Sequence, residues 1–346
     1  LLEIKKPLMR KSIVSILIAA LLLSGCNFPL RASMANPTAL PLGYSSGGAT
    51  PTPFQPMNLT QPGIPDGTPG PTAPQEIQPT PTPYADLGFE LPQSMVNILL
   101  LGSDRRADRS FRTDVIMLLS IDTAKGTAAL VSFPRDLYVT IPGVGQERIN
   151  TAQEYGGFPL TQATFQYNFG FTPEYYILTD FTGFVGIVDT LGGINVNAAY
   201  MLTDKCVLPQ AVDGMCTVHS GVNYFDGQTA LWYVRSRMTT SDFDRTRRAQ
   251  EVITAIFQKL MSLNAVNRAP ELYSMFKASV EMNVPLTTIV SLLPTAVNIY
   301  NGTSDLKRYA IGAEDVTGYV VPSNGAQVLL PNQEAVMAIM REALSQ

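Results

Sequence analysis

Arginine is the residue type whose distribution in this chain is most uneven. Eleven of the 16 arginines lie in short segments between residues 105 and 248, although the chain is acidic, with 24 Lys and Arg against 28 Asp and Glu and a formal net charge of −4. Arginine is preferred over lysine where a planar, bidentate donor must bind phosphate or carboxylate. The clustering therefore predicts a local anion pocket and argues against a nucleic-acid partner, which calls for a broadly basic surface. The eleven are Arg105, Arg106, Arg109, Arg112, Arg135, Arg148, Arg235, Arg237, Arg245, Arg247 and Arg248.

Two aspartates stand beside the first of these segments. Asp104 ends a Gly-Ser-Asp sequence, and Asp114 ends an Arg-Thr-Asp sequence. Protein-bound Mg²⁺ is typically held by one or two carboxylates together with substrate phosphates, so the pair could hold Mg²⁺, with Mn²⁺ as a substitute. An aspartate could also accept the proton of an attacking hydroxyl, and the sequence leaves Asp104, Asp114 and Asp136 as candidates. The single histidine, His219, excludes a His-rich zinc site.

Apolar runs next to these motifs predict the elements that position them. Runs at 96–101, 115–121 and 128–133 are typical of buried strands, and runs at 160–169, 181–191 and 245–263 of helices. Alternating strands and helices predict a three-layer αβα sandwich with a central mixed sheet. Ligands of such folds collect at strand ends, where the first arginine motifs lie, so we expect these motifs to converge.

The remaining arginines follow two later elements. Arg235 and Arg237 lie two residues apart in a segment that we interpret as extended, which would point them the same way. Arg245 and Arg248 would share one face of the longest helix. The helix is preceded by two acidic residues, at positions 242 and 244, which we interpret first as caps and second as site residues.

The N-terminal part of the chain predicts export and anchoring. Basic residues are followed by an apolar run at 13–23 and by Leu-Ser-Gly-Cys ending at Cys26, which predicts a lipoprotein signal peptide over residues 1–26. Acylation of Cys26 would anchor the protein to the outer face of the cell membrane. Residues 27–95 hold 15 of the 26 prolines and no hydrophobic periodicity, which predicts a disordered Pro/Thr-rich tether.

Two cysteines remain after the predicted lipidation. Cys206 and Cys216 flank a short loop, and in an exported protein this spacing favours a structural disulfide over a metal site. We assign residues 96–263 to the catalytic domain, because all the motifs lie there, and residues 264–346 to a helical C-terminal extension.

Eight ordered segments resemble the LytR-CpsA-Psr family, whose members attach glycopolymers to the bacterial cell wall. They run from about Val96 to Leu263, and the order of the set is the specific signal. The segments are 97–104 (NILLLGSD), 112–117 (RTDVIM), 132–139 (SFPRDLYV), 148–152 (RINTA), 189–194 (DTLGGI), 226–231 (DGQTAL), 234–237 (VRSR) and 242–245 (DFDR) leading into 248–250 (RAQ).

The resemblance implies a Mg²⁺-dependent phosphotransferase that moves a glycopolymer from an undecaprenyl diphosphate carrier to a peptidoglycan sugar hydroxyl. It implies that Asp104 and Asp114 hold Mg²⁺ on the diphosphate, that Arg135 acts with them in catalysis, and that the prenyl tail occupies an apolar tunnel inside the sandwich. The residues assigned to substrate binding are Arg106, Arg112, Arg148, Asn150, Arg235, Arg237, Arg245, Arg248 and Gln250.

Two departures from the family pattern leave alternatives open. Arg148 stands where the family commonly has Lys, and Ala249 stands where it commonly has Gln. The lost Gln could remove a polar contact to substrate, which keeps open a non-catalytic lipoprotein that only binds a polyprenyl phosphate. A pyrophosphatase acting on the same lipid is a further alternative. A transcriptional regulator is disfavoured by the export signal and by the absence of a helix-turn-helix pattern.

Overall fold

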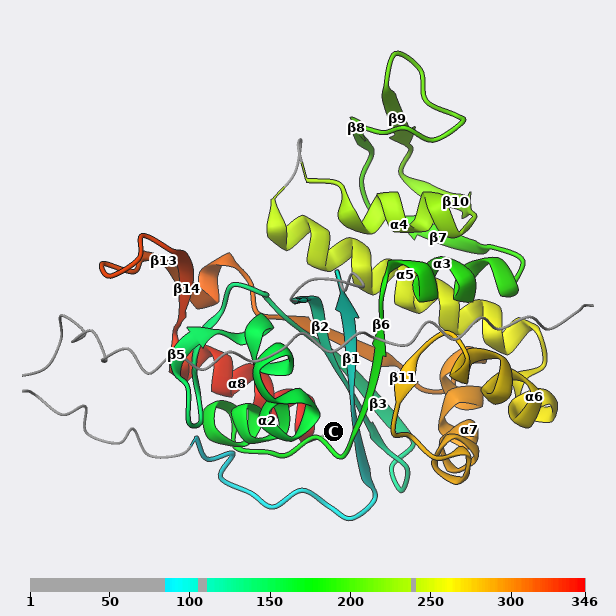
Figure 1. The fold of residues 1–346 in the computed structure, drawn as a ribbon. Coiled ribbons are helices and arrows are strands. Elements are labelled where there is room, and N and C mark those ends of the chain that lie inside the picture. Colours follow the sequence, from blue (N-terminus) through cyan, green and yellow to red (C-terminus); the bar gives the residue numbers. More distant parts are fainter. Residues whose placement is uncertain (1–84, 105–110, 238–240, 346) are drawn as a thin grey trace, which may run out of the picture. The chain divides into compact units, whose positions relative to one another are not determined.

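The structure is a computed structural model that describes residues 85–104, 111–237 and 241–345 (Figure 1). The predicted signal peptide, its Cys26 and the tether up to residue 84 lie outside these ranges, and so does Arg106.

A six-stranded mixed sheet forms the centre of the fold, with strand order β11-β6-β1-β2-β3-β12. Strands β1, β2 and β3 are antiparallel neighbours, whereas β6 runs parallel to β1 and β12 runs parallel to β3. The strand bounds are β1 Met95–Ser103, β2 Thr113–Asp122, β3 Thr127–Phe133, β6 Tyr175–Thr179, β11 Glu281–Met282 and β12 Leu306–Ala310.

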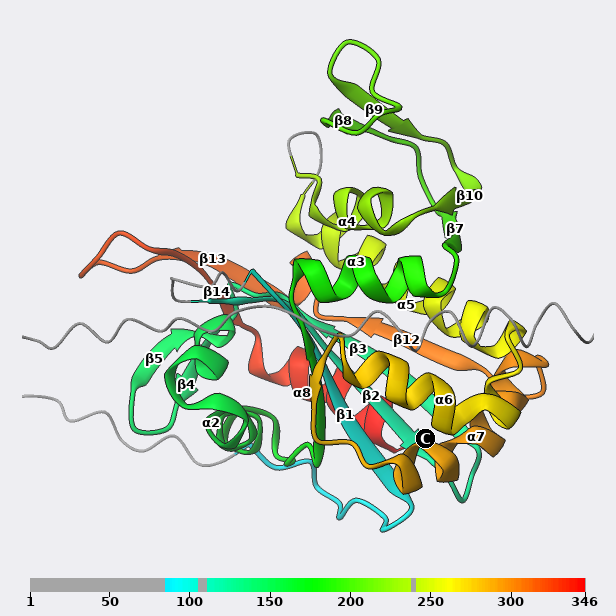
Figure 2. The same ribbon diagram turned by 45° about the vertical axis from the view of Figure 1, so that its right-hand side comes forward.

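Helices cover both faces of this sheet, which confirms the predicted three-layer α/β architecture (Figures 1 and 2). Helices α2 (Ala152–Phe169) and α8 (Gln333–Leu344) pack on one face, and α5 (Asp242–Ser262) and α7 (Leu286–Tyr300) pack on the other. The other helices are η1 Ile149–Thr151, α3 Phe181–Thr190, α4 Gly227–Arg235, α6 Ala265–Lys277 and η2 Ala313–Asp315.

Four two-stranded sheets complete the described structure. They pair β4 (Tyr138–Ile141) with β5 (Gly145–Arg148), β7 (Ile194–Ala198) with β10 (Gly221–Phe225), β8 (Leu202–Lys205) with β9 (Met215–Val218), and β13 (Val316–Val320) with β14 (Gln327–Pro331).

Side chains alternate between the two faces of the central sheet, as extended strands require. On β1, Leu99 and Leu101 face α2 and α8, whereas Ile98 and Leu100 face the opposite layer. The α2 side holds a large core in which Phe133 contacts the rings of two α2 phenylalanines at centroid distances of 5.1 and 5.0 Å. This face therefore provides the main apolar stabilisation of the sheet.

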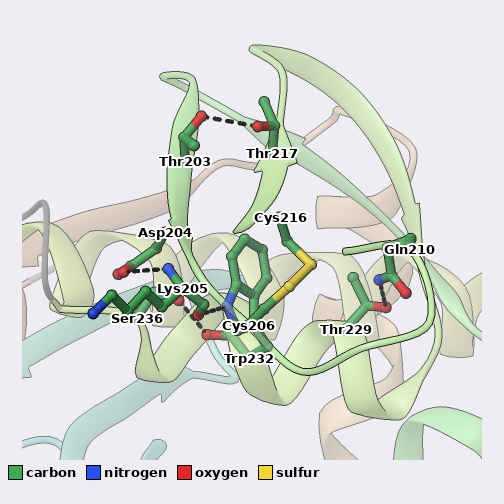
Figure 3. Close-up of a disulfide and its surroundings, with 10 residues drawn as sticks. All are labelled: Thr203, Asp204, Lys205, Cys206, Gln210, Cys216, Thr217, Thr229, Trp232 and Ser236. Atoms are coloured by element: carbon green, nitrogen blue, oxygen red, sulfur yellow. Dashed lines mark hydrogen bonds between the residues drawn. A yellow bond between two sulfur atoms is a disulfide. The ribbon is translucent and has the colours of Figure 1, made fainter. Parts of the chain in front are cut away.

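A second apolar core lies beyond α5, away from the sheet. It joins α3 and α4 to the β7–β10 pair and to the side of α5 that faces away from the central sheet, where Val252 and Ala255 are buried. The β8–β9 hairpin projects from this region (Figure 2), and Cys206 and Cys216 form the expected disulfide across it (Figure 3). The Trp232 indole of α4 donates a hydrogen bond to the Lys205 carbonyl at 2.9 Å, which fastens the hairpin to the helix below it.

The folded part of the chain begins earlier than the predicted end of the tether at residue 95. Ala85 donates a backbone hydrogen bond to Tyr167, and Leu87 is buried in the core under α2 and α8. Residues 85–94 carry too few apolar positions to show periodicity, and they are ordered by docking on elements far along the chain.

The description of residues 264–346 as a helical extension is incomplete. Helices α6, α7 and α8 are present, but β11 and β12 form the two edge strands of the central sheet, and β13 pairs with β14. Without this segment the sheet would lose both edges and α8 would be missing from the core. The C-terminal part is integral to the sandwich rather than appended to it.

Arg235 does not lie in the extended segment that the sequence suggested. It is the last residue of α4, because Asp226 caps the start of that helix through Thr229 and the helix continues until Ser236 donates to the Trp232 carbonyl. Within the described ranges, no helix is long and apolar enough to cross a membrane.

Candidate functional site

A β-bulge sets the position of Asp114 at the end of the central sheet. Gly102 pairs with Val115 and Ser103 pairs with Thr113, so Asp114 is the extra residue on β2 and has no partner on β1. Bulges turn a side chain out of the regular alternation and are common beside functional sites. The Thr113 hydroxyl donates to the Asn150 carbonyl at 3.2 Å, which fixes the strand one residue before the bulge.

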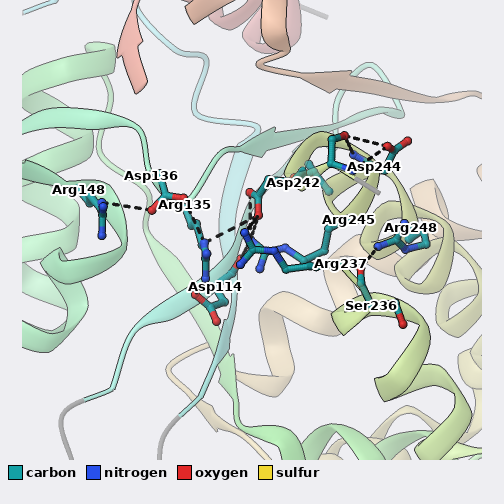
Figure 4. A network of polar contacts seen from close by, with 12 residues as sticks. Asp114, Arg135, Asp136, Arg148, Ser236, Arg237, Asp242, Asp244, Arg245 and Arg248 are labelled. Carbon is teal, nitrogen blue, oxygen red and sulfur yellow. Dashed lines mark hydrogen bonds and ion pairs between the residues drawn. The ribbon is translucent and has the colours of Figure 1, made fainter. Parts of the chain in front are cut away.

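Arg135, directly after β3, makes the closest contact with the bulged residue. Its guanidinium donates to Asp114 Oδ1 at 2.8 Å and to Asp136 Oδ2 at 3.3 Å (Figure 4). The same group lies 3.9 Å from Asp242 Oδ1. Arg135 therefore joins the ends of two strands to the start of α5, as the strand-end placement of the motifs predicted.

Asp242 is a second centre of this network. Its carboxylate lies 2.9 Å from Arg245 and 3.6 Å from Arg237, and Arg245 also donates to the Asp114 carbonyl at 3.3 Å. Figure 4 shows these side chains gathered around the two aspartates. The arginine–aspartate network is defined here as Asp114, Arg135, Asp136, Arg148, Arg237, Asp242 and Arg245.

Arg148 enters the network through Asp136. Its Nε lies 3.2 Å from Asp136 Oδ1, and its terminal nitrogen donates to the Gln327 carbonyl at 2.6 Å. Arg148 ends β5 and Gln327 begins β14, so this side chain also ties two outer hairpins together. Asn150 lies nearby and is buried, with an Oδ1 that accepts no hydrogen bond from the described residues.

Asp104 closes the end of β1 against the residue before β2. Its Oδ1 accepts a hydrogen bond from the Arg112 amide at 2.8 Å, and its own amide donates to the Arg112 carbonyl at 3.2 Å. The Arg112 residue is exposed. The pairing holds Asp104 beside the segment that contains Asp114.

Burial and charge act in opposite directions on the two central guanidinium groups. Burial alone would lower the pKa of Arg135, but its hydrogen bond to Asp114 and the charges of Asp114, Asp136 and Asp242 raise that pKa above its ordinary value. Arg245 is more deeply buried, and this desolvation lowers its pKa despite the neighbouring Asp242. An anion binding beside Arg245 would supply charge compensation that its present surroundings do not fully provide.

Two residues predicted to bind substrate lie away from this network. Arg248 is 1% exposed, and its guanidinium donates to the carbonyls of Tyr233 and Ser236 at the end of α4. The Gln250 amide donates at 2.7 Å to the Ser132 hydroxyl and to the Tyr309 carbonyl, so it links α5 to β3 and β12. In the structure both side chains pack α5 against neighbouring elements, and their role in substrate binding stays a prediction.

Arg235 is also separated from the network. It is exposed and its guanidinium stacks on the Phe181 ring, 4.2 Å from the centroid. Arg237 reaches Asp242, so the two arginines do not act as a pair. Arg235 is the last residue of α4 and Arg237 lies beyond that helix, so the two side chains point in different directions.

The interpretation of the two acidic residues at the start of α5 holds for only one of them. Ser241 is the N-cap residue, and Asp244 completes a capping box with it at 3.1 Å. Asp242 turns instead to the arginines, and sequence reasoning underestimated it. Its spacing of three residues from Arg245 is the signal that could have identified it.

The residues at this end of the sheet suit a hard divalent cation. Asp104 and Asp114 each use one carboxylate oxygen in the contacts above, and the other accepts no hydrogen bond from the described residues. Two carboxylates with open oxygens, completed by phosphate oxygens, match the preferred ligands of Mg²⁺. Within the described residues there is no group of three or more acidic, His or Cys side chains that could hold a metal by itself.

An apolar layer adjoins the network beneath α5. Met117 and Leu130 of the sheet are buried against Ala249, but most of the surrounding apolar side chains are only partly buried. These half-buried residues are Leu100, Val115, Leu119, Val234, Ile253 and Leu306. Val115 follows Asp114 directly, so the half-buried layer begins at the network.

Comparison with known proteins gives the same family that the sequence motifs resemble. The model of the LytR_cpsA_psr family matches residues 75–343. The chain is 28% identical over 261 residues to the polyisoprenyl-teichoic acid–peptidoglycan teichoic acid transferase TagT of Bacillus subtilis, an alignment that covers 73% of this chain and 77% of TagT.

Solved structures show the same fold. The crystal structure of B. subtilis TagV superimposes with a TM-score of 0.61 at 21% identity, over 74% of this chain and 99% of TagV. The structure of TagT with bound octaprenyl pyrophosphate lipid gives a TM-score of 0.52 at 25% identity, over 75% of this chain and 92% of that one.

Proposed function

The chain belongs to the LytR-CpsA-Psr family, and on that premise we propose that it transfers a glycopolymer from undecaprenyl diphosphate to a peptidoglycan sugar hydroxyl. The observation that carries the proposal is the arginine–aspartate network at the end of the sheet, with a half-buried apolar layer beginning beside it. A lipid diphosphate needs both features, because one end is doubly anionic and the other is a long hydrocarbon.

In the proposed reaction the acceptor oxygen attacks the phosphorus that carries the glycan. A new P–O bond forms, the bridging P–O bond breaks, and undecaprenyl phosphate leaves with the bond electrons. The hydroxyl proton passes to a carboxylate of the site, for which Asp104, Asp114 and Asp136 remain candidates. Arg135, Arg237 and Arg245 would hold the diphosphate oxygens and stabilise the charge that develops on them.

We assign Mg²⁺ to Asp104 and Asp114, with Mn²⁺ as a possible substitute. The ion would neutralise charge on the diphosphate during transfer. Occupation of Asp114 by the ion would weaken its pairing with Arg135 and free this guanidinium for a phosphate oxygen. In the same proposal the lipidated Cys26 holds the domain on the outer face of the cell membrane, where carrier and acceptor meet.

The apolar layer between the sheet and α5 is the proposed site of the prenyl tail. Leu100, Leu119 and Ile253 lie in its interior but remain partly accessible. Ala249 is 5% exposed within this layer and faces Met117 rather than the charged network. The non-catalytic alternative, which rests on the missing Gln at this position, is separated from transfer by the turnover measurement below.

The test uses purified protein with a lipid-diphosphate-linked glycan and a peptidoglycan acceptor. We expect Asp104→Ala, Asp114→Asn and Arg135→Ala to lower kcat/KM by about 10²–10³-fold, the range for removal of one preorganised electrostatic contact. Arg268→Ala is the matched control, because Arg268 lies on α6, outside the arginine–aspartate network, and pairs with Glu271 on the surface. Chelation of divalent ions should abolish transfer, and Mg²⁺ should restore it.

Retention of normal transfer by the three site variants would contradict the assigned roles. Release of free glycan phosphate without polymer transfer would instead favour the pyrophosphatase. Tight lipid binding with no turnover in Mg²⁺ or Mn²⁺ would favour the non-catalytic alternative.

A further inference from the structure

A polar cavity opens beside Ser103 and Asp104, on the side of β1 away from the arginine–aspartate network. Its volume is about 400 Å³, and it is lined by Ser103, Leu178, Asp180 and the segment 278–281. Ser103 directly precedes Asp104, and Gly102 pairs with Thr179, so the cavity lies where β1 and β6 end side by side.

The cavity and the arginine–aspartate network differ in charge. The described lining carries the carboxylates of Asp180 and Glu281 and the hydroxyls of Ser103 and Ser279, but no cationic side chain. The two carboxylates of the described lining disfavour an anion such as a diphosphate. A neutral ligand rich in hydroxyl and amide donors would be bound, because carboxylates form strong hydrogen bonds with such donors.

The walls of the cavity are held in place by close packing. Strand β11 pairs with β6 through Glu281 and Leu178, and Tyr176 donates to Glu281 at 3.0 Å. A side chain at Gly183 would meet the Ser279 carbonyl at 2.1 Å, so α3 packs directly against the 278–281 segment and only glycine fits there. The cavity is therefore a built feature between three elements rather than a gap in a loop.

We propose that this cavity binds the acceptor sugar of peptidoglycan. The inference rests on the proposed transfer reaction and adds the position of its second substrate. The sheet order places the cavity at β11, β6 and β1, the network at β2 and β3, and Asp104 between them. An acceptor and a diphosphate held on opposite sides of Asp104 suit an in-line displacement, in which attacking and leaving oxygens lie on opposite sides of phosphorus.

Ala278→Trp tests the proposal by filling the cavity from its exposed rim. Ala278 is the exposed C-cap residue of α6, so no buried contact is lost. Val266→Trp is the matched control, because Val266 is exposed on the same helix and does not line the cavity. We expect Ala278→Trp to raise the acceptor KM tenfold or more while the Kd for the lipid-diphosphate donor stays unchanged. Glu281→Gln, which removes one charged acceptor, should raise the acceptor KM by roughly tenfold.

A binding measurement separates this inference from the proposed function. A soluble disaccharide–peptide fragment of peptidoglycan should bind the wild-type protein and the Val266→Trp control in calorimetry, and Ala278→Trp should abolish that binding. Wild-type protein that binds the fragment but transfers nothing would refute the transfer reaction and retain the subsite. Equal fragment binding by Ala278→Trp and wild type would overturn the subsite, and so would a rise in donor Kd with an unchanged acceptor KM.

Discussion

The two faces of the central sheet are packed to different degrees. The face under α2 and α8 contributes to a cluster of 24 buried apolar residues, among them Phe133, Phe165 and Phe169 with rings in direct contact. The face under α5 and α7 contributes to clusters of five and three buried apolar residues, surrounded by side chains that remain partly accessible. Protein interiors are normally close-packed, and the less tightly covered layer is where the proposed function places the prenyl tail.

One face of the sheet is closely packed and contributes mainly stability, whereas the other face is the proposed site of the lipid. Leu99 and Leu100 are neighbours on β1, yet Leu99 is fully buried on the α2 side and Leu100 is half-buried on the α5 side. The residues on the first side hold the sheet together. The residues on the second side remain partly accessible, and they begin beside the arginine–aspartate network.

Replacing a core phenylalanine on the α2 side should have the largest effect on stability. Phe165 is 0% exposed and contacts three other phenylalanine rings. We expect Phe165→Ala to lower the free energy of unfolding by about 3–5 kcal/mol, because a cavity forms in a closely packed core. Chemical denaturation measures the loss. A loss below about 1 kcal/mol would show that the two faces do not differ in packing.

A substitution in the half-open layer should affect lipid binding more than stability. Leu119→Trp adds volume to the face under α5, where Leu119 is only partly buried. We expect binding of a polyprenyl diphosphate to weaken about tenfold, or about 1.4 kcal/mol, while the free energy of unfolding changes by less than this. Lipid titration and denaturation of the same variant provide both values. Unchanged lipid affinity with a large loss of stability would mean that this layer is an ordinary core.

The capping box of α5 supplies the smallest and most local prediction. The Ser241 hydroxyl holds the pKa of Asp244 below its ordinary value, together with charges on nearby arginines. A carboxyl group with a lowered folded-state pKa contributes stability above its unfolded pKa near 4 and loses that contribution as the pH falls through the folded value. We expect Ser241→Ala to cost about 1 kcal/mol at pH 7 and less at pH 3.

Thermal unfolding of the Ser241→Ala variant at the two pH values provides the measurement. Thr246→Ala, one turn into the same helix, serves as the comparison because Thr246 bonds the backbone of Asp242 and takes no part in the cap. A larger loss at pH 3 than at pH 7 would contradict the role of the Asp244 carboxylate.

Local sequence patterns were sufficient for the fold class, for the first three strands of the central sheet, for helices such as α3 and α5, and for the disulfide. The apolar runs at 115–121 and 128–133 fall within β2 and β3, and the predicted helix at 181–191 corresponds to α3. These signals are local, because strand and helix periodicity depends on neighbouring residues. Cys206 and Cys216 are ten residues apart, and their loop is closed by the β8–β9 hairpin.

The chain itself determined which residue types are available to the site, and the tertiary structure decided which of them meet. Arg135, Arg237 and Arg245 converge on Asp114 and Asp242, whereas Arg248 and Gln250 occupy the same helix and face inward to hold α4, β3 and β12. A spacing of three residues on a helix cannot tell a network residue from a packing residue, since the direction of each side chain depends on what packs against the helix. The bulge at Asp114 and the cavity beside Asp104 depend in the same way on strand pairing between residues distant in the chain.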